Sequence, residues 1–182
     1  MYLENSILEK NELRQGDIIG NIHLLGVLNI DSILYQTNKD GAPTGWQIPA
    51  QQKFGPVAIL SHSCEISLEN KLKITSIILA PIRDVNSASE KSKVKQLIET
   101  NKIVLGTPAS FLKYFYLEPT DKLPFQEGSV VDFSKCFSVK NDNYETILKN
   151  KIIQLNSETT NDFSLKMALY YHRNNMPIAT PA

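Results

Sequence analysis

The sequence has few cysteines and no long apolar run, and these absences exclude two classes of protein. Its two cysteines, Cys64 and Cys136, are too few for a secreted disulfide framework. No stretch approaches the roughly 18 consecutive apolar residues that a membrane-spanning helix needs. The N-terminal segment MYLENSILEKNELRQGD contains acids and lacks both an apolar core and a small-residue cleavage site, so it does not resemble a signal peptide. We therefore expect a reduced, cytoplasmic protein that does not associate with membranes.

Neither sign of charge is in excess, since 19 basic and 19 acidic residues give a formal net charge of zero. Bulk charge therefore gives no support for non-specific nucleic-acid binding. The eight glycines form no phosphate-binding loop, and no two carboxylates stand at a catalytic spacing. The sequence gives no reason to expect a cofactor.

The residues that are present predict a fold made mainly of strands. With 182 residues, of which 42% are hydrophobic, the chain can bury a core without the help of a metal or a disulfide. Apolar or alternating runs of the kind found in strands occupy residues 18–30, 32–37, 56–61, 73–82, 109–119 and 129–140. The runs at 56–61 and 73–82 follow one another closely, so we expect them to pair as neighbours.

One segment between the predicted strands changes to a helical period. In residues 88–100, Val94, Leu97 and Ile98 fall on one side of a helix and charged residues on the other. The segment KSKVKQLIETNK is basic, and we interpret it as a solvated face rather than a nucleic-acid contact.

A second helix is predicted at the C-terminal end, over residues 160–176, with Asn161 or Asp162 as its N-cap. Unevenly spaced strands joined mostly by loops favour a small antiparallel barrel over a doubly wound fold. We therefore predict a mostly β protein of the α+β class, a single domain over 1–182. It would contain an SH3-like barrel over 14–140, with one inserted and one terminal helix.

Three short motifs resemble the MazF/PemK family of bacterial toxin endoribonucleases. Gly16-Asp17-Ile18 matches the family's Gly-Asp-Ile, which leads into the first strand. Pro56–Ser61, PVAILS, matches its "PVLVLS"-like strand, and Pro81-Ile82 matches the start of its Pro-Ile-Thr. The resemblance covers less than half of the chain, and it implies an SH3-like barrel.

The same comparison argues against ribonuclease activity. In that family, an arginine before the proline and the threonine of Pro-Ile-Thr handle the scissile phosphate. Here Gly55 and Arg83 occupy those two positions. Glycine has no group that can accept or donate a proton near an attacking hydroxyl. The rest of the chain resembles an uncharacterised group of bacterial proteins with a "SQSCDI"-type motif, here SHSCEI, which implies no established activity.

The candidate site is His62-Ser63-Cys64-Glu65, which directly follows an apolar strand. If this segment is extended, His62 and Cys64 point to the same side. A histidine beside a thiol can take its proton and leave a nucleophilic thiolate. The alternative that we favour is structural: Cys64 is a small buried hydrophobic side chain, the histidine bonds the backbone at a strand end, and the cluster organises a binding loop.

A metal site is a further alternative for this cluster, since histidine and thiolate both bind zinc. Two ligands are too few, so Cys136 and His172, or Glu65, would have to converge on His62 and Cys64. The sequence does not show such convergence, and we name no metal ligand.

Arg83 and Lys53 complete the set of candidate residues. We expect Arg83 to reach the same loop cluster as His62 and Cys64 and to contact an anion or an acidic partner. Its alternative is a solvated pair with Asp84 at a strand end. The aromatics of KYFYL, residues 113–117, suit either base stacking or a core, and we favour the core.

Two classes of function follow from these features. The favoured hypothesis is a non-catalytic interaction module that binds a protein partner encoded nearby, in a toxin–antitoxin, defence or stress-response system, with a homodimer as an alternative. The second is an endoribonuclease acting on single-stranded RNA through Lys53, His62 and Arg83, with His62 as general acid or base. Thiol or metal chemistry at His62 and Cys64 is the third.

Overall fold

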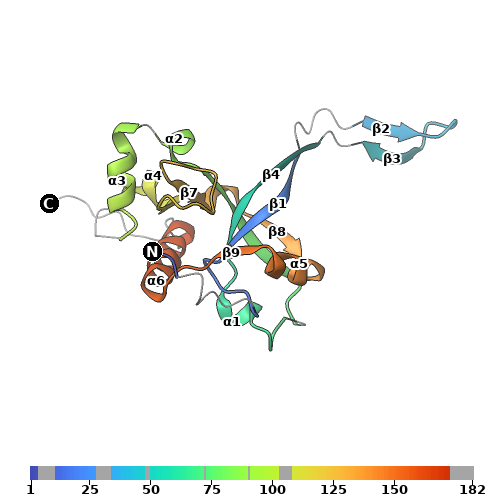
Figure 1. The fold of residues 1–182 in the computed structure, drawn as a ribbon. Helices are drawn as coiled ribbons and strands as arrows, with labels where there is room; N and C mark the ends of the chain where they lie inside the picture. The colour runs from blue at the N-terminus through green and yellow to red at the C-terminus, as the bar shows by residue number, and fades with distance from the viewer. Residues whose placement is uncertain are drawn as a thin grey trace.

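The protein is described by a computed structural model over residues 1–3, 11–27, 34–47, 50–71, 73–89, 91–102 and 108–172. Its centre is a seven-stranded sheet in which every described pairing is antiparallel, and helices pack around it (Figure 1). This confirms the α+β class with a large β component. The pairing order is β6-β7-β5-β4-β1-β9, with β8 also on β5, and the sheet is not closed into a barrel.

The strands of this sheet are β1 (Ile18–Val27), β4 (Ala50–Ile59), β5 (Ser76–Asp84), β6 (Tyr114–Leu117), β7 (Ser129–Asp132), β8 (Phe137–Lys140) and β9 (Lys151–Ile153). A separate hairpin consists of β2 (Leu34–Thr37) and β3 (Pro43–Gln47). The helices are α1 (Ser63–Ile66), α2 (Val85–Ala88), α3 (Val94–Glu99), α4 (Ala109–Leu112), α5 (Tyr144–Lys149) and α6 (Ser157–His172). Short 3-10 helices are η3 (Lys91–Lys93), η4 (Phe133–Lys135) and η5 (Asn141–Asn143). Within the described ranges, none of the helices combines the length and the apolar character needed to cross a bilayer.

The predicted pairing of the two central strands is confirmed. Val57 lies opposite Pro81 and Ile59 opposite Leu79 in the antiparallel β4–β5 pair. Burial is complete at Val57, Ile59 and Leu79, as a continuous apolar run in a central strand predicts.

The single strand predicted over 129–140 is wrong, because this segment forms two strands on the same edge of β5. β7 pairs with Ile82–Asp84, and β8 pairs with Ser76–Leu79. Between β7 and β8, the 3-10 helix η4 accommodates the extra residues of the segment that pairs with β5. Pro81 lies between the part of β5 that pairs with β8 and the part that pairs with β7. On this edge of β5, away from β4, no described strand pairs with Pro81, so its missing N–H is tolerated.

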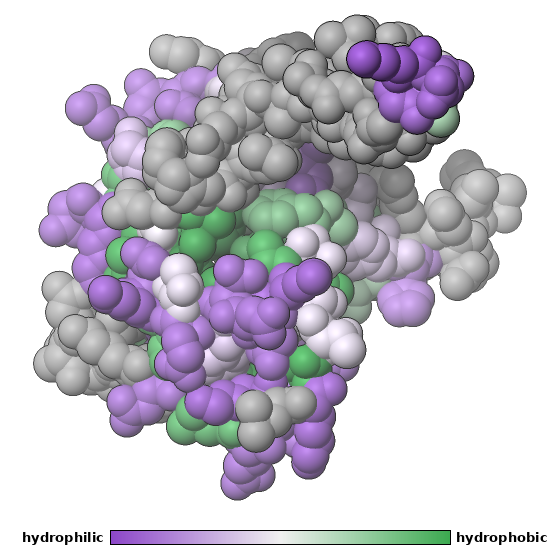
Figure 2. Space-filling model, turned by 90° about the vertical axis from the view of Figure 1, so that its right-hand side faces the viewer, coloured by the Kyte–Doolittle hydropathy of each residue, from purple (hydrophilic) through white to green (hydrophobic). Residues whose placement is uncertain are grey.

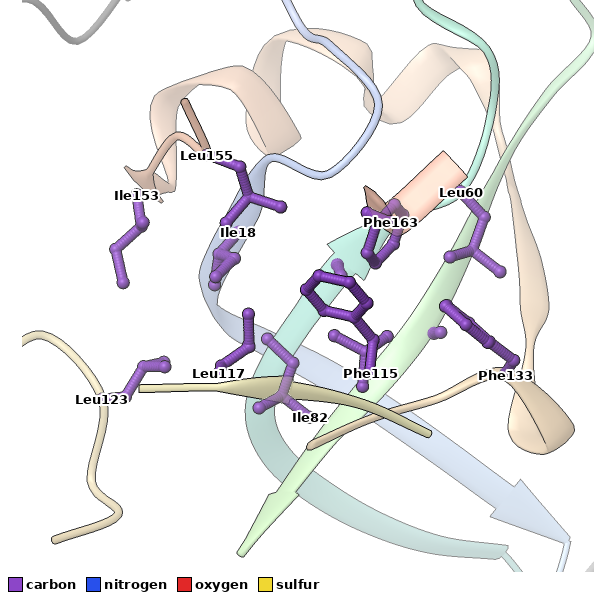
Figure 3. Packing of buried hydrophobic residues seen from close by; sticks show 13 residues of the cluster. Ile18, Leu60, Ile82, Phe115, Leu117, Leu123, Phe133, Ile153, Leu155 and Phe163 are labelled. Carbon is purple, nitrogen blue, oxygen red and sulfur yellow. The ribbon is translucent and has the colours of Figure 1, made fainter. Parts of the chain in front are cut away.

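The main core lies between the sheet and α6. The core interpretation of the KYFYL aromatics is confirmed, since Phe115 belongs to this core and Tyr114 and Tyr116 are buried in a second cluster. All four residues of β6 are buried. Phe163 of α6 meets Phe115 edge to face at 5.1 Å between ring centroids and Phe133 at 5.3 Å (Figure 3). Such pairs add to the stabilisation that burial of the rings provides.

The terminal helix begins earlier than predicted. Its N-cap is Asn156, whose Oδ1 accepts a hydrogen bond from the backbone N–H of Thr159 at 2.9 Å, so the caps predicted at Asn161 and Asp162 are wrong. The first turn, Ser157 to Thr160, is wholly polar and has no apolar period that would reveal it.

The inserted helix is also shorter than predicted, because the segment divides into α2, η3 and α3. In α3, Leu97 is fully buried, whereas Ile98 is 44% exposed. The expectation that Ile98 shares a buried face with Leu97 is therefore wrong. A helix of six residues covers only a narrow stripe of its neighbours.

A two-stranded arm extends from the sheet. Ile22–Val27 of β1 pairs with Ala50–Gly55 of β4, and neither half pairs with another described strand. The β2–β3 hairpin lies beyond the far end of this arm (Figure 1). Gly41 adopts a φ of 80° there, in agreement with the hairpin signal of Asp40-Gly41.

Candidate functional site

The His62–Glu65 cluster lies where β4 leaves the sheet, in a turn of helix rather than in an extended segment. The hydroxyl of Ser61 accepts a hydrogen bond from the backbone N–H of Ile78 at 2.9 Å, which fixes the end of β4 against β5. His62 then caps α1, since its Nδ1 accepts from the backbone N–H of Cys64 at 3.3 Å. The imidazole thus bonds the backbone at a strand end, as the structural interpretation predicts. The other part of that interpretation, a buried Cys64, is wrong, because Cys64 is exposed.

The same capping geometry brings a thiol to the imidazole. The Sγ of Cys64 lies 2.9 Å from Nδ1 of His62, and both residues are exposed. Because Nδ1 accepts from a backbone N–H, the neutral ring carries its proton on Nε2. The single Nδ1 lone pair is shared by the backbone N–H at 3.3 Å and the thiol at 2.9 Å, and it can take the thiol proton if the longer backbone bond is given up, as base catalysis of thiol reactions requires.

The backbone of this cluster is held on both sides. The hydroxyl of Ser63 accepts from the backbone N–H of Gln15 at 3.0 Å, which ties α1 to the segment before β1. On the other side, the carbonyl of Cys64 accepts from Asn70 Nδ2 at 2.6 Å. Ser63 therefore organises the loop, whereas Glu65 is exposed to solvent.

A pocket of about 560 Å³ opens beside Cys64. It lies between the segment before β1, α1 and the first turns of α6. Its lining residues are mainly polar, and they are Leu3, Glu12, Arg14, Gln15, Ser63, Cys64, Gln154, Leu155, Ser157, Thr160 and Asn161. His62 contacts the thiol without lining this pocket. Residues 12–15 and 154–161 were missed by sequence reasoning, because no local pattern indicates that they meet Cys64.

Arg83 does not join this cluster, so the expected shared rim is wrong. In the antiparallel β4–β5 register, Ile59 lies opposite Leu79 and Val57 opposite Pro81. Arg83 therefore lies toward the arm, whereas His62 lies beyond the other end of the strand pair. Adjacent antiparallel strands end at opposite edges of a sheet, which the order of the motifs in the sequence does not reveal.

The solvated Arg83–Asp84 pair is not observed either, because each residue has its own partner. Arg83 donates from its guanidinium to Asp132 Oδ2 at 3.0 Å and to the carbonyl of Ser87 at 3.4 Å. Asp84 caps α2 by accepting from the backbone N–H of Asn86 at 2.7 Å. Since the carboxylate of Asp132 is only 1% exposed, Arg83 serves as its counter-ion.

Lys53 is also distant from the cluster. It lies opposite Leu24 in the arm. At about 3.3 Å per residue, it is about 20 Å along β4 from Ile59. The three residues of the ribonuclease hypothesis therefore do not converge.

The residues of the metal hypothesis are not brought together in the described part of the chain. No three His, Cys, Asp or Glu side chains there form a group able to hold an ion. Cys136 is exposed and contacts the hydroxyl of Tyr171, and His172 is exposed at the end of α6.

A buried ion pair was also missed by sequence reasoning. Asp17 of the Gly-Asp-Ile motif lies 2.7 Å from Lys151 Nζ, and both side chains are almost fully buried. Burial raises the pKa of Asp17 to about 6, although the attraction of Lys151 acts in the opposite direction. The lysine beside the three apolar residues of KIIQL was the available signal.

Comparison with known proteins adds no family to this geometry: the chain matches none of the protein-family models and none of the curated proteins.

Proposed function

We propose that this chain is a non-catalytic, MazF/PemK-like interaction module, a protein-binding component of a bacterial toxin–antitoxin, defence or stress-response system. The observation that carries the non-catalytic part is the engagement of Arg83 with the buried Asp132. The positions that resemble the family's phosphate-handling pair thus hold Gly55, which has no side chain, and an arginine whose charge is already matched.

The proposal includes a fold derived from the family's SH3-like barrel. The three resembling motifs lie on β1, β4 and β5, which are neighbours in the sheet in the order β5-β4-β1. In this view the sheet is an opened barrel. It is extended beyond β5 by β7, which pairs with β5, and by β6, which pairs with β7. The arm corresponds to the variable loop that separates the first two motifs.

Protein binding is supported by the open edges of the arm. In the described residues, the distal halves of β1 and β4 pair only with each other, so each has one edge of free backbone N–H and C=O groups. An open edge is a template for an added strand from another chain. We assign the open edge of β4 to an extended segment of a protein partner, with a second copy of the chain as the competing outcome.

The surface beside the sheet gives additional support. Figure 2 shows hydrophobic residues near the middle of one face, with hydrophilic side chains below and beside them. A hydrophobic area bordered by polar side chains is typical of a protein-binding surface.

The test blocks the open edge of β4 and leaves the arm in place. The N–H of Leu60 faces the β5 side of β4, so by the two-residue alternation of a strand the N–H of Gln52 faces the open edge, and Gln52→Pro removes it. As a control, an Asn-Gly turn can replace residues 28–49 and keep both arm strands, because Val27 lies opposite Ala50. We expect the full chain and this shortened variant to form a defined complex with the product of a neighbouring gene, measured by co-purification and light scattering, and Gln52→Pro to bind at least about tenfold more weakly.

A chain that stays monomeric with every neighbouring gene product would contradict the proposal. A self-association lost in Gln52→Pro would instead identify a second copy as the occupant of this edge.

The endoribonuclease alternative has a direct test. Mixed single-stranded RNA incubated with the purified chain should remain intact, because Lys53, His62 and Arg83 do not converge. Cleavage that disappears in His62→Ala would replace the interaction module by the enzyme.

A further inference from the structure

We infer that Cys64 is a reactive thiol, activated by His62, that forms a mixed disulfide with a polar, peptide-like low-molecular-weight disulfide held in the adjacent pocket. Thiol reactivity at this position is independent of protein binding by the arm, which lies at the other end of β4.

The first support is the contact between the two side chains. Sγ of Cys64 lies 2.9 Å from Nδ1 of His62, and the backbone N–H of Cys64 donates to the same nitrogen at 3.3 Å. The backbone bond keeps Nδ1 unprotonated in the neutral ring, and the thiol, which is the nearer donor, can transfer its proton to Nδ1 when that backbone bond opens. The hydrogen bond from Asn70 to the Cys64 carbonyl holds the thiol in this position.

The second support is accessibility together with a place for the reagent. Cys64 is exposed, and it lines a pocket of about 560 Å³. His62 meets the thiol from outside this pocket, so the base does not obstruct an incoming disulfide.

The lining of the pocket selects the class of reagent. Amide and hydroxyl side chains from Gln154, Ser157, Thr160 and Asn161 dominate, and Arg14 adds a cation that is paired with Glu12 at 2.7 Å. Such groups bind the amides and carboxylates of a small peptide by hydrogen bonds. They do not suit an apolar acyl chain, which would leave them without partners.

The reaction balances without any further oxidant. The proton of Cys64 moves to Nδ1 of His62, which gives up its bond from the backbone N–H, and the thiolate attacks one sulfur of the disulfide R–S–S–R. The S–S bond breaks, and R–S⁻ leaves and takes the proton from the imidazolium. Cys64 is oxidised to the mixed disulfide Cys64–S–S–R, and half of the reagent is reduced to R–SH.

The first experiment measures thiol reactivity, with Cys136 as the matched control. Cys136 is also exposed, but its thiol contacts Tyr171 rather than a histidine. At pH 7, Cys64 in Cys136→Ser should react with iodoacetamide about tenfold faster than Cys136 in Cys64→Ser. His62→Gln should remove this advantage while the circular dichroism spectrum stays unchanged, because His62 is exposed. Equal rates for the two cysteines, or a rate that does not respond to His62→Gln, would overturn the activation of Cys64.

The second experiment tests the pocket, with oxidised glutathione as the probe. Intact-mass measurement should show one adduct on Cys64 that dithiothreitol removes. Asn161→Trp narrows the pocket from the exposed side of α6. It should slow adduct formation about fivefold or more and leave the iodoacetamide rate unchanged. Adduct formation on Cys136 instead, or at the same rate in Asn161→Trp, would overturn the role of the pocket.

Discussion

At the scale of single residues, the Gly-Asp-Ile motif is explained by three different demands. Gly16 has a φ of 84°, and its Cα lies so close to Leu155 that an added Cβ would meet Cδ1 at 2.9 Å. Asp17 forms the buried pair with Lys151, and Ile18 belongs to the main core. The motif therefore joins the start of β1 to β9, whatever the protein does.

The first prediction concerns the Asp17–Lys151 pair and its pH dependence. Since the pKa of Asp17 is raised from 3.8 to about 6, its contribution to stability is present below about pH 4 and is lost as the pH rises toward 6. Lys151→Met removes the attraction that opposes this rise, so the pKa moves further upward. In urea titrations, we expect the variant to lose about 3–5 kcal/mol of unfolding free energy at pH 7.5. At pH 5 this loss should be smaller by at least about 1 kcal/mol.

The matched control replaces both partners. In Asp17→Asn/Lys151→Met no carboxyl titrates at this position. The difference in unfolding free energy from the wild type should therefore change with pH only through the titration of Asp17 in the wild type. A cost of Lys151→Met that is the same at both pH values would contradict this account.

At the scale of elements, β5 connects the two parts of the sheet. β4 covers one edge, while β8 and β7 share the other edge on either side of Pro81. The Arg83–Asp132 ion pair lies where β7 ends and η4 begins, and Asp132 also accepts a hydrogen bond there from the backbone N–H of Ser134 at 3.1 Å. We conclude that Arg83 links β5 to the start of η4.

The second prediction follows from that position. Arg83→Ala leaves the buried carboxylate of Asp132 without its cation, and we expect it to lower the unfolding free energy by about 1–2 kcal/mol in urea. An arginine that was kept only to bind a ligand would give no such loss. Lys102→Ala is the control: its pair with Glu158 is about three-quarters exposed on both sides and should contribute nothing measurable.

At the scale of the whole molecule, the compact part of the structure and the arm play different roles. The cores are built from the sheet, α6 and the residues that pack against them, whereas β2 and β3 pair only with each other in the described chain. We therefore expect the body to be stable without the hairpin.

The third prediction is the thermal behaviour of the shortened variant, in which Asn-Gly replaces residues 28–49. Its unfolding midpoint should stay within about 3 °C of that of the full chain, since the replaced segment adds little to the described core. Differential scanning calorimetry on both chains measures this. A fall of about 10 °C or more would show that the hairpin belongs to the folding unit.

The sequence by itself determined what depends on local patterns. The α+β class, the β4–β5 pairing and the aromatic core follow from runs and periods that neighbouring residues share. The proximity of His62 and Cys64 also follows from their spacing, although a helix cap rather than a strand produces it.

Only the tertiary structure decided how distant segments meet. The antiparallel register sends Arg83 away from His62, and a 3-10 turn divides one predicted strand into two. The pocket beside Cys64 and the Asp17–Lys151 pair join segments more than a hundred residues apart in the chain. Such contacts depend on the direction and register of every strand between them, and no local pattern contains that information.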